Sequence, residues 1–342
     1  MFIVLYDNQM HALGKARTTY YADTWSIKRR TFAFDEMKIT CKAYDNSAKA
    51  CFVALHENRG SPKHVMLAGV PSTQDGKTSI TAVDIRQIFD QKIYIDLENN
   101  VFTSVKNLYI YLLNLPKNYD NLGFDYSIDL SELDNNPPIW NDGEAIEKSA
   151  GVDNLWSILQ KVGNIYDVYL DVIVDFVEHE ITIVGHTFSE LVSLKITDFG
   201  QAKVLNNNTV TNRAICGTLA EIAAGTYQEF YLQNDNVVVE ASAVDSSKII
   251  YPARIETFED DDSAKAVSKG LETLYKNRFQ QKVELEADNA LGYIIRKIGK
   301  STYADISGYN KADDNTTVRL PLYEISEDSK GKYQVTFGRL EL

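Results

Sequence analysis

Short strand-like segments, each closed by turn residues, constrain the fold of this chain more than any other feature of its sequence. Between Ile39 and Tyr44, apolar and polar residues alternate, which is the period of a strand with one buried face. Cys51–His56 and His64–Val70 flank turn residues and predict a hairpin. Several short strands with turns between them are typical of a barrel or a sandwich. The other elements expected in this region are strands at Phe2–Tyr6, Trp25–Arg30, Met37–Tyr44, Ile80–Val83 and Lys92–Asp96, and a short helix at Asp84–Phe89.

Four longer segments carry apolar residues at helical spacing, and they predict α-helices. The acidic run Glu259–Ser263 precedes one of them, and we interpret it as capping, because acidic residues complement the positive end of a helix dipole. A calcium loop is the alternative, but the alternating acidic pattern of such loops is missing. The four segments are Phe102–Leu113 before Pro116, Leu155–Val162 between a cap at Asp153 and an end at Gly163, Val267–Leu274, and Leu291–Ile298 before Gly299.

The second half of the chain adds more strands to these helices. Residues 117–150 are rich in Asn, Asp, Pro and Gly and mark an exposed loop. Beyond it the chain shows two hairpin patterns and two closing strands. The hairpins are Val168–Val177 with Ile181–Gly185 and Tyr227–Leu232 with Val237–Ala241, and the closing strands are Val318–Ile325 and Tyr333–Phe337.

Charge limits the functions that this chain can have. Its net charge is −13, and a protein that binds nucleic acid through phosphates needs clustered Lys and Arg instead. The acidity is consistent with simple solubility or with a surface past which DNA slides without sticking. No apolar run is long enough to span a membrane, and the start of the chain reads as a strand rather than a signal peptide. The three cysteines, Cys41, Cys51 and Cys216, form no CxxC pair and support neither a zinc site nor a disulfide framework.

Three fragments of catalytic motifs occur, and all are incomplete. His179-Glu180 begins a zinc-protease motif, but Ile183 stands where the second histidine is needed. Asp198–Gly200 spells the kinase D-F-G without its accompanying motifs. Gly76–Thr78 ends like a phosphate-binding loop, but Pro71 replaces the first glycine. We therefore expect no enzyme activity, no catalytic, cofactor-binding or metal-binding residue, and no cofactor, although carboxylate pairs that meet only in space stay open.

The tryptophans are the other candidates for a binding site. Trp25, Trp140 and Trp156 could line a sugar site, since aromatic rings join apolar faces to polar edges. Trp156 lies in an apolar helical stripe, which favours the core. Trp140 follows Pro137-Pro138 in a polar loop and is the best candidate for an exposed contact, with core packing as its alternative.

Three pairs of consecutive segments in the first half of the chain have an order that can be compared with that of known proteins. The first pair is an aromatic strand with basic residues followed by an acidic strand-forming run. The second is a glycine-containing strand followed by a strand and a short helix. The third leads from a helix into a hairpin. The pairs are Thr24–Arg30 with Phe34–Ile39, Met66–Val70 with Ile80–Phe89, and Asn154–Leu159 with Ile165–Tyr169.

In this order the segments resemble the tail-associated hub proteins of siphophages that infect Gram-positive bacteria, and these resemble the trimeric baseplate hub of contractile-tailed phages. The resemblance implies an α+β, β-rich fold with two tube-like antiparallel β-barrels and helical or loop insertions. It implies a barrel in residues 1–97, a middle α/β region with hairpins in 98–250, and a region in 251–342 that completes a second barrel. Many such proteins continue into fibre or hydrolase modules, whereas this sequence stops at Leu342 after a strand-like segment.

What the resemblance implies about function is a structural hub of a phage tail tip. Its partners would be two further copies in a homotrimeric ring and neighbouring tail proteins such as the distal tail protein and the tape measure. DNA would pass through the bore in transit only, and the lining of the bore should be acidic or neutral. The protein would be assembled in the bacterial cytoplasm and reside in the virion tail. The alternatives are a carbohydrate-binding adhesion module of the tail tip and a cell-wall hydrolase.

Overall fold

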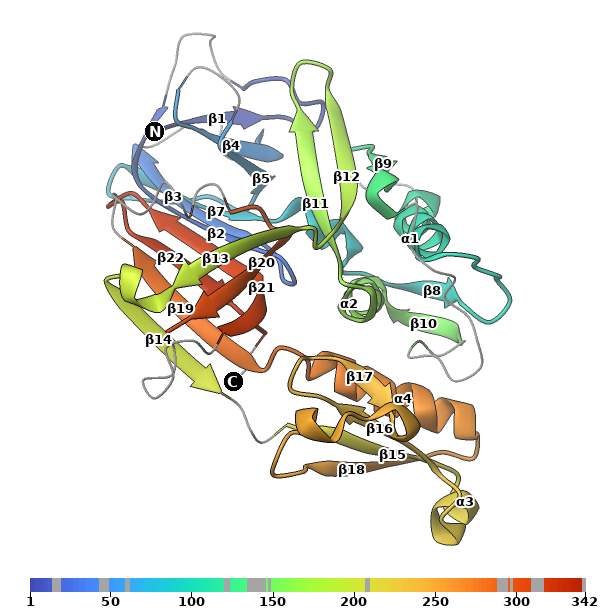
Figure 1. Cartoon of the computed structure of the whole chain (residues 1–342). Helices are drawn as coiled ribbons and strands as arrows, with labels where there is room; N and C mark the ends of the chain where they lie inside the picture. Colours follow the sequence, from blue (N-terminus) through green and yellow to red (C-terminus); the bar gives the residue numbers. More distant parts are fainter. Residues whose placement is uncertain are drawn as a thin grey trace.

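A computed structural model of the chain describes residues 1–13, 20–42, 49–58, 62–119, 124–133, 146, 149–206, 210–287, 295, 298–308 and 317–339. The fold is α+β and rich in strands, as the sequence predicts (Figure 1). Within the described residues, no helix is long and apolar enough to cross a membrane.

Six strands near the N-terminus pair in a closed ring. They are β1 (Phe2–Tyr6), β2 (Tyr20–Arg30), β3 (Glu36–Lys42), β4 (Phe52–His56), β5 (His64–Ala68) and β7 (Lys77–Val83), with the short β6 (Ser72–Gln74) beside β7. The ladders follow the order β1-β4-β5-β7-β3-β2, and β1 also pairs with β2. All of these ladders are antiparallel. Alternate residues such as Ile3, Trp25 and Met37 point inward and form one core, which explains the period of two in the sequence.

A second group of strands continues the same sheet through the antiparallel pair β2–β21. It consists of β13 (Glu190–Lys195), β14 (Gln201–Asn206), β19 (Gln281–Ala287), β20 (Thr302–Ser307), β21 (Thr317–Asp328) and β22 (Tyr333–Phe337). The order is β13-β20-β21-β22-β19-β14. The β13–β20 ladder is parallel, which differs from the wholly antiparallel pairing expected. These strands enclose their own core, which includes Leu285, Leu320 and Val335.

The middle of the chain packs a helical layer and a long hairpin against the first ring. Its elements are η2 (Ile85–Phe89), β8 (Lys92–Asp96), α1 (Val105–Asn114), η3 (Leu115–Asn118), β9 (Ser127–Asp129), η4 (Ser131–Leu133), β10 (Ala150–Asn154), α2 (Leu155–Tyr166), β11 (Val168–Asp175) and β12 (Glu180–Thr187). One large core joins these elements to Phe52 of β4. The hairpin β11–β12 stands beside the ring (Figure 1).

A small α/β layer, residues 211–276, lies at the opposite end of the molecule from β1 (Figure 1). It contains β15 (Arg213–Gly217), α3 (Leu219–Ala224), β16 (Gln228–Leu232), β17 (Val238–Glu240), the 3-10 turns η6 (Ala241–Ala243) and η7 (Ser246–Lys248), β18 (Ile255–Glu259) and α4 (Ser263–Lys276). The sheet order is β17-β16-β15-β18, and α4 covers one face of it. Asp262 caps α4 by accepting a hydrogen bond from the backbone N–H of Ala264, as the capping interpretation predicts.

The predicted hairpins and closing strands are confirmed, and the predicted bounds of α2 are wrong. Asn154 rather than Asp153 caps this helix, through the backbone N–H of Ser157. The helix continues past Gly163 to Tyr166, because Asp167 adopts the left-handed conformation that ends it. Pro116, which should stop α1, lies inside the 3-10 turn η3 that directly follows it.

Some predictions concern residues that the structure does not describe. Trp140, the Pro137–Gly143 part of the predicted loop and most of the predicted helix Leu291–Ile298 lie outside the described residues. The described part of the predicted exposed loop 117–150 contradicts the prediction, because it forms β9 and η4 and buries Leu130 and Leu133 in the core. The division of the chain after residues 97 and 250 stays a prediction. The small α/β layer has strands on both sides of residue 250, and β13 and β14 join the second group of strands from within residues 98–250.

Candidate functional site

The two groups of strands share a polar face. At the junction, Lys28 lies opposite Ser326 and Ser26 opposite Asp328. Directly opposed residues share a face of a sheet, so both cores lie on one side and these polar residues on the other. The polar sheet face consists of Thr24, Ser26, Lys28, Arg30, Glu36, Lys38, Thr40, Lys42, Lys77, Ser79, Thr81, Gln201, Lys203, Lys282, Glu284, Glu286, Glu324, Ser326, Asp328, Gln334 and Thr336.

Charges of both signs lie on this polar sheet face. The strands of the ring contribute four lysines, Arg30 and Glu36, and the second group contributes four carboxylates, Lys203 and Lys282. Lys28 Nζ lies 3.9 Å from Glu324 Oε1 across the junction. Hydroxyl groups of Ser and Thr fill much of the space between the charges. Cationic side chains therefore outnumber carboxylates on the strands of the ring, whereas carboxylates outnumber cations on the second group of strands.

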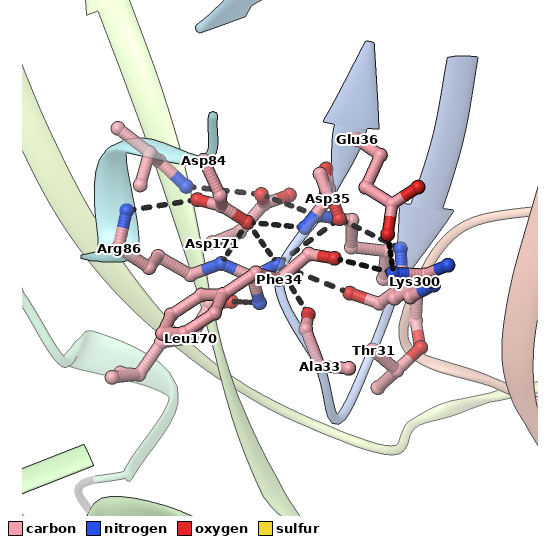
Figure 2. Close-up of polar contacts among 12 residues, drawn as sticks. Thr31, Ala33, Phe34, Asp35, Glu36, Asp84, Arg86, Leu170, Asp171 and Lys300 are labelled. Atoms are coloured by element: carbon pink, nitrogen blue, oxygen red, sulfur yellow. Dashed lines mark hydrogen bonds and ion pairs between the residues drawn. The ribbon is translucent and has the colours of Figure 1, made fainter. Parts of the chain in front are cut away.

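A buried charge cluster holds the parts of the molecule together, and Arg86 is its centre (Figure 2). The side chain of Arg86 is 1% exposed. Its guanidinium donates to Asp84 Oδ2 and, at 3.0 Å, to Asp35 Oδ1. It also donates to the carbonyl oxygens of Ala33 at 2.8 Å and Leu170 at 2.9 Å. The five donors of arginine are therefore spread over the β2–β3 turn, η2 and β11.

Lys300 completes the cluster from the segment that leads into β20. Its ammonium donates to Asp35 Oδ2 and Asp171 Oδ1, both at 3.0 Å. The cluster thus ties the ring, the middle layer and the second group of strands to one another (Figure 2). His64 lies at its edge, with Nε2 3.5 Å from Asp35 Oδ2.

The ionisation of the cluster follows from these contacts. Burial opposes the charge of Asp84, but Arg86 outweighs it and the pKa of Asp84 is lowered. Burial likewise opposes the charge of Asp171, while Lys300 and Arg86 lower its pKa to about 2. Burial alone would lower the pKa of Arg86, yet Asp84 and Asp35 raise it. Burial lowers the pKa of His64, against the opposing effect of Asp35. These shifts favour the charged forms of Asp84, Asp171 and Arg86 and the neutral form of His64.

This arrangement suits a rigid joint better than a catalytic site. A general acid or base must reach a substrate within hydrogen-bond distance. Asp84 and Arg86 are almost completely buried and turned toward each other (Figure 2). The D-x-R spacing of Asp84 and Arg86 was the only local signal in the sequence, and it does not reveal Asp35, Asp171 or Lys300, which come from distant segments.

The structure does not bring the motif fragments together. His179 lies in the β11–β12 turn, where its ring Nδ1 is 3.1 Å from the carbonyl oxygen of Gln9. Asp198 ends the 3-10 turn η5 (Ile196–Asp198), and Gly200 precedes β14. Gly76 has a φ of 71° in the tight turn between β6 and β7, a conformation that suits glycine. Each fragment therefore lies in a different turn.

Metal and thiol chemistry find no support in the described residues. No group of three or more His, Cys, Asp or Glu side chains there could hold a metal ion. Cys41 and Cys216 are buried free thiols, and burial raises the pKa of Cys216 to about 12, so its reactive thiolate is scarce.

Two of the three tryptophans belong to cores. Trp25 and Trp156 are both 9% exposed, and Trp156 stacks on Phe34 with ring centroids 4.4 Å apart. Neither ring offers the open face that a sugar site needs, so a site built on these two residues is not supported.

The fold, with its closed ring, its second strand group and its small α/β layer, matches known tail proteins over its whole length. No sequence-family profile matches the chain, and no curated protein matches it. Among solved structures, a prophage MuSo2 43 kDa tail protein from Shewanella oneidensis is similar, with a TM-score of 0.55 and 14% identity over 99% of this chain and 98% of that one. A tail protein from Neisseria meningitidis MC58 has a TM-score of 0.54 and 10% identity, over 99% and 95% of the two chains.

A third neighbour is the prophage tail protein gp18 from Listeria monocytogenes EGD-e. Its TM-score is 0.57 at 11% identity, over 99% of this chain and 94% of that chain. At such identities the likeness concerns the fold alone. The chain therefore has the fold of phage and prophage tail proteins, and the predicted Gram-positive host stays a prediction.

Proposed function

We propose that this chain is a non-enzymatic structural hub of a phage tail tip that works as a homotrimeric ring. The observation that carries the proposal is the match of the whole fold to tail proteins along nearly the full length of both chains. A match to a single domain would be compatible with many functions. A match that includes every part favours a shared structural task.

The arrangement of strands is consistent with tube-like barrels that associate side by side. A closed ring leaves few strand edges exposed, and the pair β2–β21 fixes the two strand groups next to each other in one sheet. In a trimer, two barrels in each subunit would give a pseudo-sixfold ring that continues the tail tube. Such a ring needs head-to-tail contacts that close after a fixed rotation.

We assign the polar sheet face to the bore of this ring. Its charges are of both signs and hydroxyl groups lie between them, so we expect DNA to move past it without being retained. The buried cluster around Arg86 would keep the two strand groups rigid while neighbouring proteins pull on the ring. Those neighbours would include the distal tail protein and the tape measure, with assembly in the bacterial cytoplasm and residence in the virion tail.

The oligomeric state tests the proposal. We expect light scattering of the purified chain at high concentration to give a mass near three times 38.6 kDa, and electron microscopy of the same sample to show rings. A strictly monomeric protein that also fails to join neighbouring tail proteins would contradict it. Zymography on cell-wall material addresses the hydrolase alternative, and a clear lytic band would favour that alternative instead.

A further inference from the structure

The helix α3 of the small α/β layer exposes its apolar side chains. It has six residues, fewer than an isolated helix needs in water. A capping box between Thr218 and Glu221 begins it, and Gly225, with a φ of 73°, ends it. None of its residues is buried, and Leu219 is 67% exposed. Because helices in proteins owe most of their stability to the packing of an apolar face, we expect a partner to cover α3.

The exposed residues of α3 lie on one side of the helix, since their positions span less than half a turn. They are Leu219, Ala220, Ala223 and Ala224, and we call them the α3 tip. The helix directly follows β15 and projects from one end of the small α/β layer (Figure 1).

A second apolar surface lies at the other end of the layer, where β15 and the parallel strand β18 begin. α4 covers the face of the sheet that carries Ala214. Ile255 lies opposite Arg213, on the other face, and is 51% exposed. Tyr251, in the segment that leads into β18, is 75% exposed. We call Tyr251, Arg254 and Ile255 the β18 entry.

The charges beside these two surfaces are of opposite sign. Gly217, which ends β15 before α3, pairs with Glu259, so the exposed carboxylates of Glu259 and Asp261 lie near the α3 tip. At the β18 entry, Arg254 is exposed and forms no ion pair within the part of the chain that the structure describes. Arg213 adds no free charge there, because Glu229 already compensates it.

We propose that the α3 tip of one copy packs on the β18 entry of the next copy, an inference that rests on the homotrimeric ring proposed above. The two surfaces match in polarity and in charge, which favours a second copy of this chain as the partner. They lie at opposite ends of one layer, so the contact is head-to-tail and can close into a ring. The contact covers Leu219 with Tyr251 and Ile255 and brings carboxylates to Arg254.

Disulfide trapping between copies tests this contact. The variants Leu219→Cys/Ile255→Cys and Leu219→Cys/Tyr251→Cys place one thiol on each surface, and mild oxidation followed by a non-reducing gel reveals bonds between copies. The matched control is Leu219→Cys/Val177→Cys, since Val177 is 82% exposed in the β11–β12 turn and belongs to neither surface. The native cysteines stay in every variant, so any bands that they cause also appear in the control.

We expect covalent dimers and trimers from at least one of the two variants, none from the control, and their loss on reduction. Light scattering of the unoxidised proteins gives the mass independently. A trimeric chain without cross-links from either variant would overturn this contact and leave the proposed ring standing, whereas a monomeric chain would overturn both. A covalent dimer from Leu219→Cys alone would place the tip against itself and would also overturn the contact.

Leu219→Asp tests whether the tip contributes to assembly. Because a carboxylate without a partner would be buried in the contact, we expect the concentration at which half of the chain is trimeric to rise about tenfold or more. Val177→Asp should leave that concentration unchanged, and circular dichroism checks that both variants fold. Equal effects of the two substitutions would contradict the assignment of α3 to the interface.

Discussion

At the scale of single residues, Arg86 shows how a buried charge can define the shape of a protein without taking part in chemistry. Its partners come from the β2–β3 turn, η2 and β11, and Asp35 connects it to Lys300. A buried ion pair adds little net stability, because desolvation offsets the attraction. Removing the arginine alone is costly for the same reason, since it leaves a buried carboxylate without a compensating charge.

Arg86→Gln should therefore destabilise the fold strongly. Asp84 would stay buried without the guanidinium that compensates it, and Asp35 would keep only Lys300. We expect the free energy of unfolding to fall by about 3–5 kcal/mol. Urea unfolding followed by circular dichroism measures this change. Arg319→Gln is the control, because its pair with Asp305 is on the surface and Arg319 is 58% exposed, so its loss should be below about 1 kcal/mol. Equal effects of both substitutions would show that the cluster is not a joint.

The same cluster predicts how stability depends on pH. Asp171 has a pKa of about 2 in the fold, against an ordinary value of 3.8. A carboxyl group with a lowered pKa contributes stability that is fully present above the ordinary value and is lost as the pH falls towards the folded value. We expect the free energy of unfolding to decline between about pH 4 and pH 2.

Asp171→Asn should flatten this acid limb of the stability curve. The measurement is urea unfolding at a series of pH values for both proteins. Asp198→Asn, which changes an exposed carboxylate outside the cluster, should leave the limb unchanged. An Asp171→Asn protein whose stability declines as steeply as that of the original chain would contradict the assignment.

At the scale of secondary-structure elements, close packing fixes where α2 meets β11. Gly163 lies inside the helix, and a Cβ atom there would come within 2.5 Å of the backbone carbonyl oxygen of Val168. The glycine therefore serves the close approach of helix and strand rather than the end of the helix. The backbone of β11 cannot move aside as a flexible side chain could.

Gly163→Ala should thus destabilise the protein. Alanine favours a helix by about 1 kcal/mol over glycine, but the overpacking costs about 1–3 kcal/mol, so we expect a net loss of up to about 2 kcal/mol. Thermal and urea unfolding give its size. Gly200→Ala is the control, since a Cβ atom at Gly200 would meet nothing within 4 Å. A gain in stability for Gly163→Ala would show that helix and strand are packed less closely.

Secondary-structure elements could be predicted from the sequence where residues near one another in the chain determine them. The hairpins β11–β12 and β16–β17 follow from alternation and turn residues, and α4 follows from its apolar stripe and acidic cap. The bounds of α2 could not be predicted, because Gly163 looks like a helix end when Val168 is not known to be its neighbour. The parallel pair β13–β20 and the contact of Lys300 with Asp35 join segments more than 100 residues apart, and no pattern in the sequence indicates such contacts.

At the scale of the whole molecule, the proposed ring would give the polar sheet face a function. In one isolated chain it is a broad surface of hydroxyl groups and charges of both signs. In a trimeric ring, three copies of this face would converge on a shared axis. How strongly an added positive charge on this face promotes DNA binding then depends on whether three copies of the face converge.

Replacing Ser79 and Thr81 with arginine tests whether copies of this face converge. Both side chains are exposed on β7, so the fold should tolerate the change. In a ring, six new arginines would surround the bore, and DNA binding should become measurable and strongly dependent on salt. In a monomer, two arginines on a chain of net charge −13 should bind DNA no better than before.

The matched control places two arginines at Ser246 and Thr257, which are exposed on the small α/β layer. Filter binding with duplex DNA at several salt concentrations compares the three proteins, with light scattering of each to establish its mass. The assignment of this face to the bore requires DNA binding by the β7 variant alone. If both variants retain DNA equally, the added charge acts without convergence, and the face cannot be the lining of a channel.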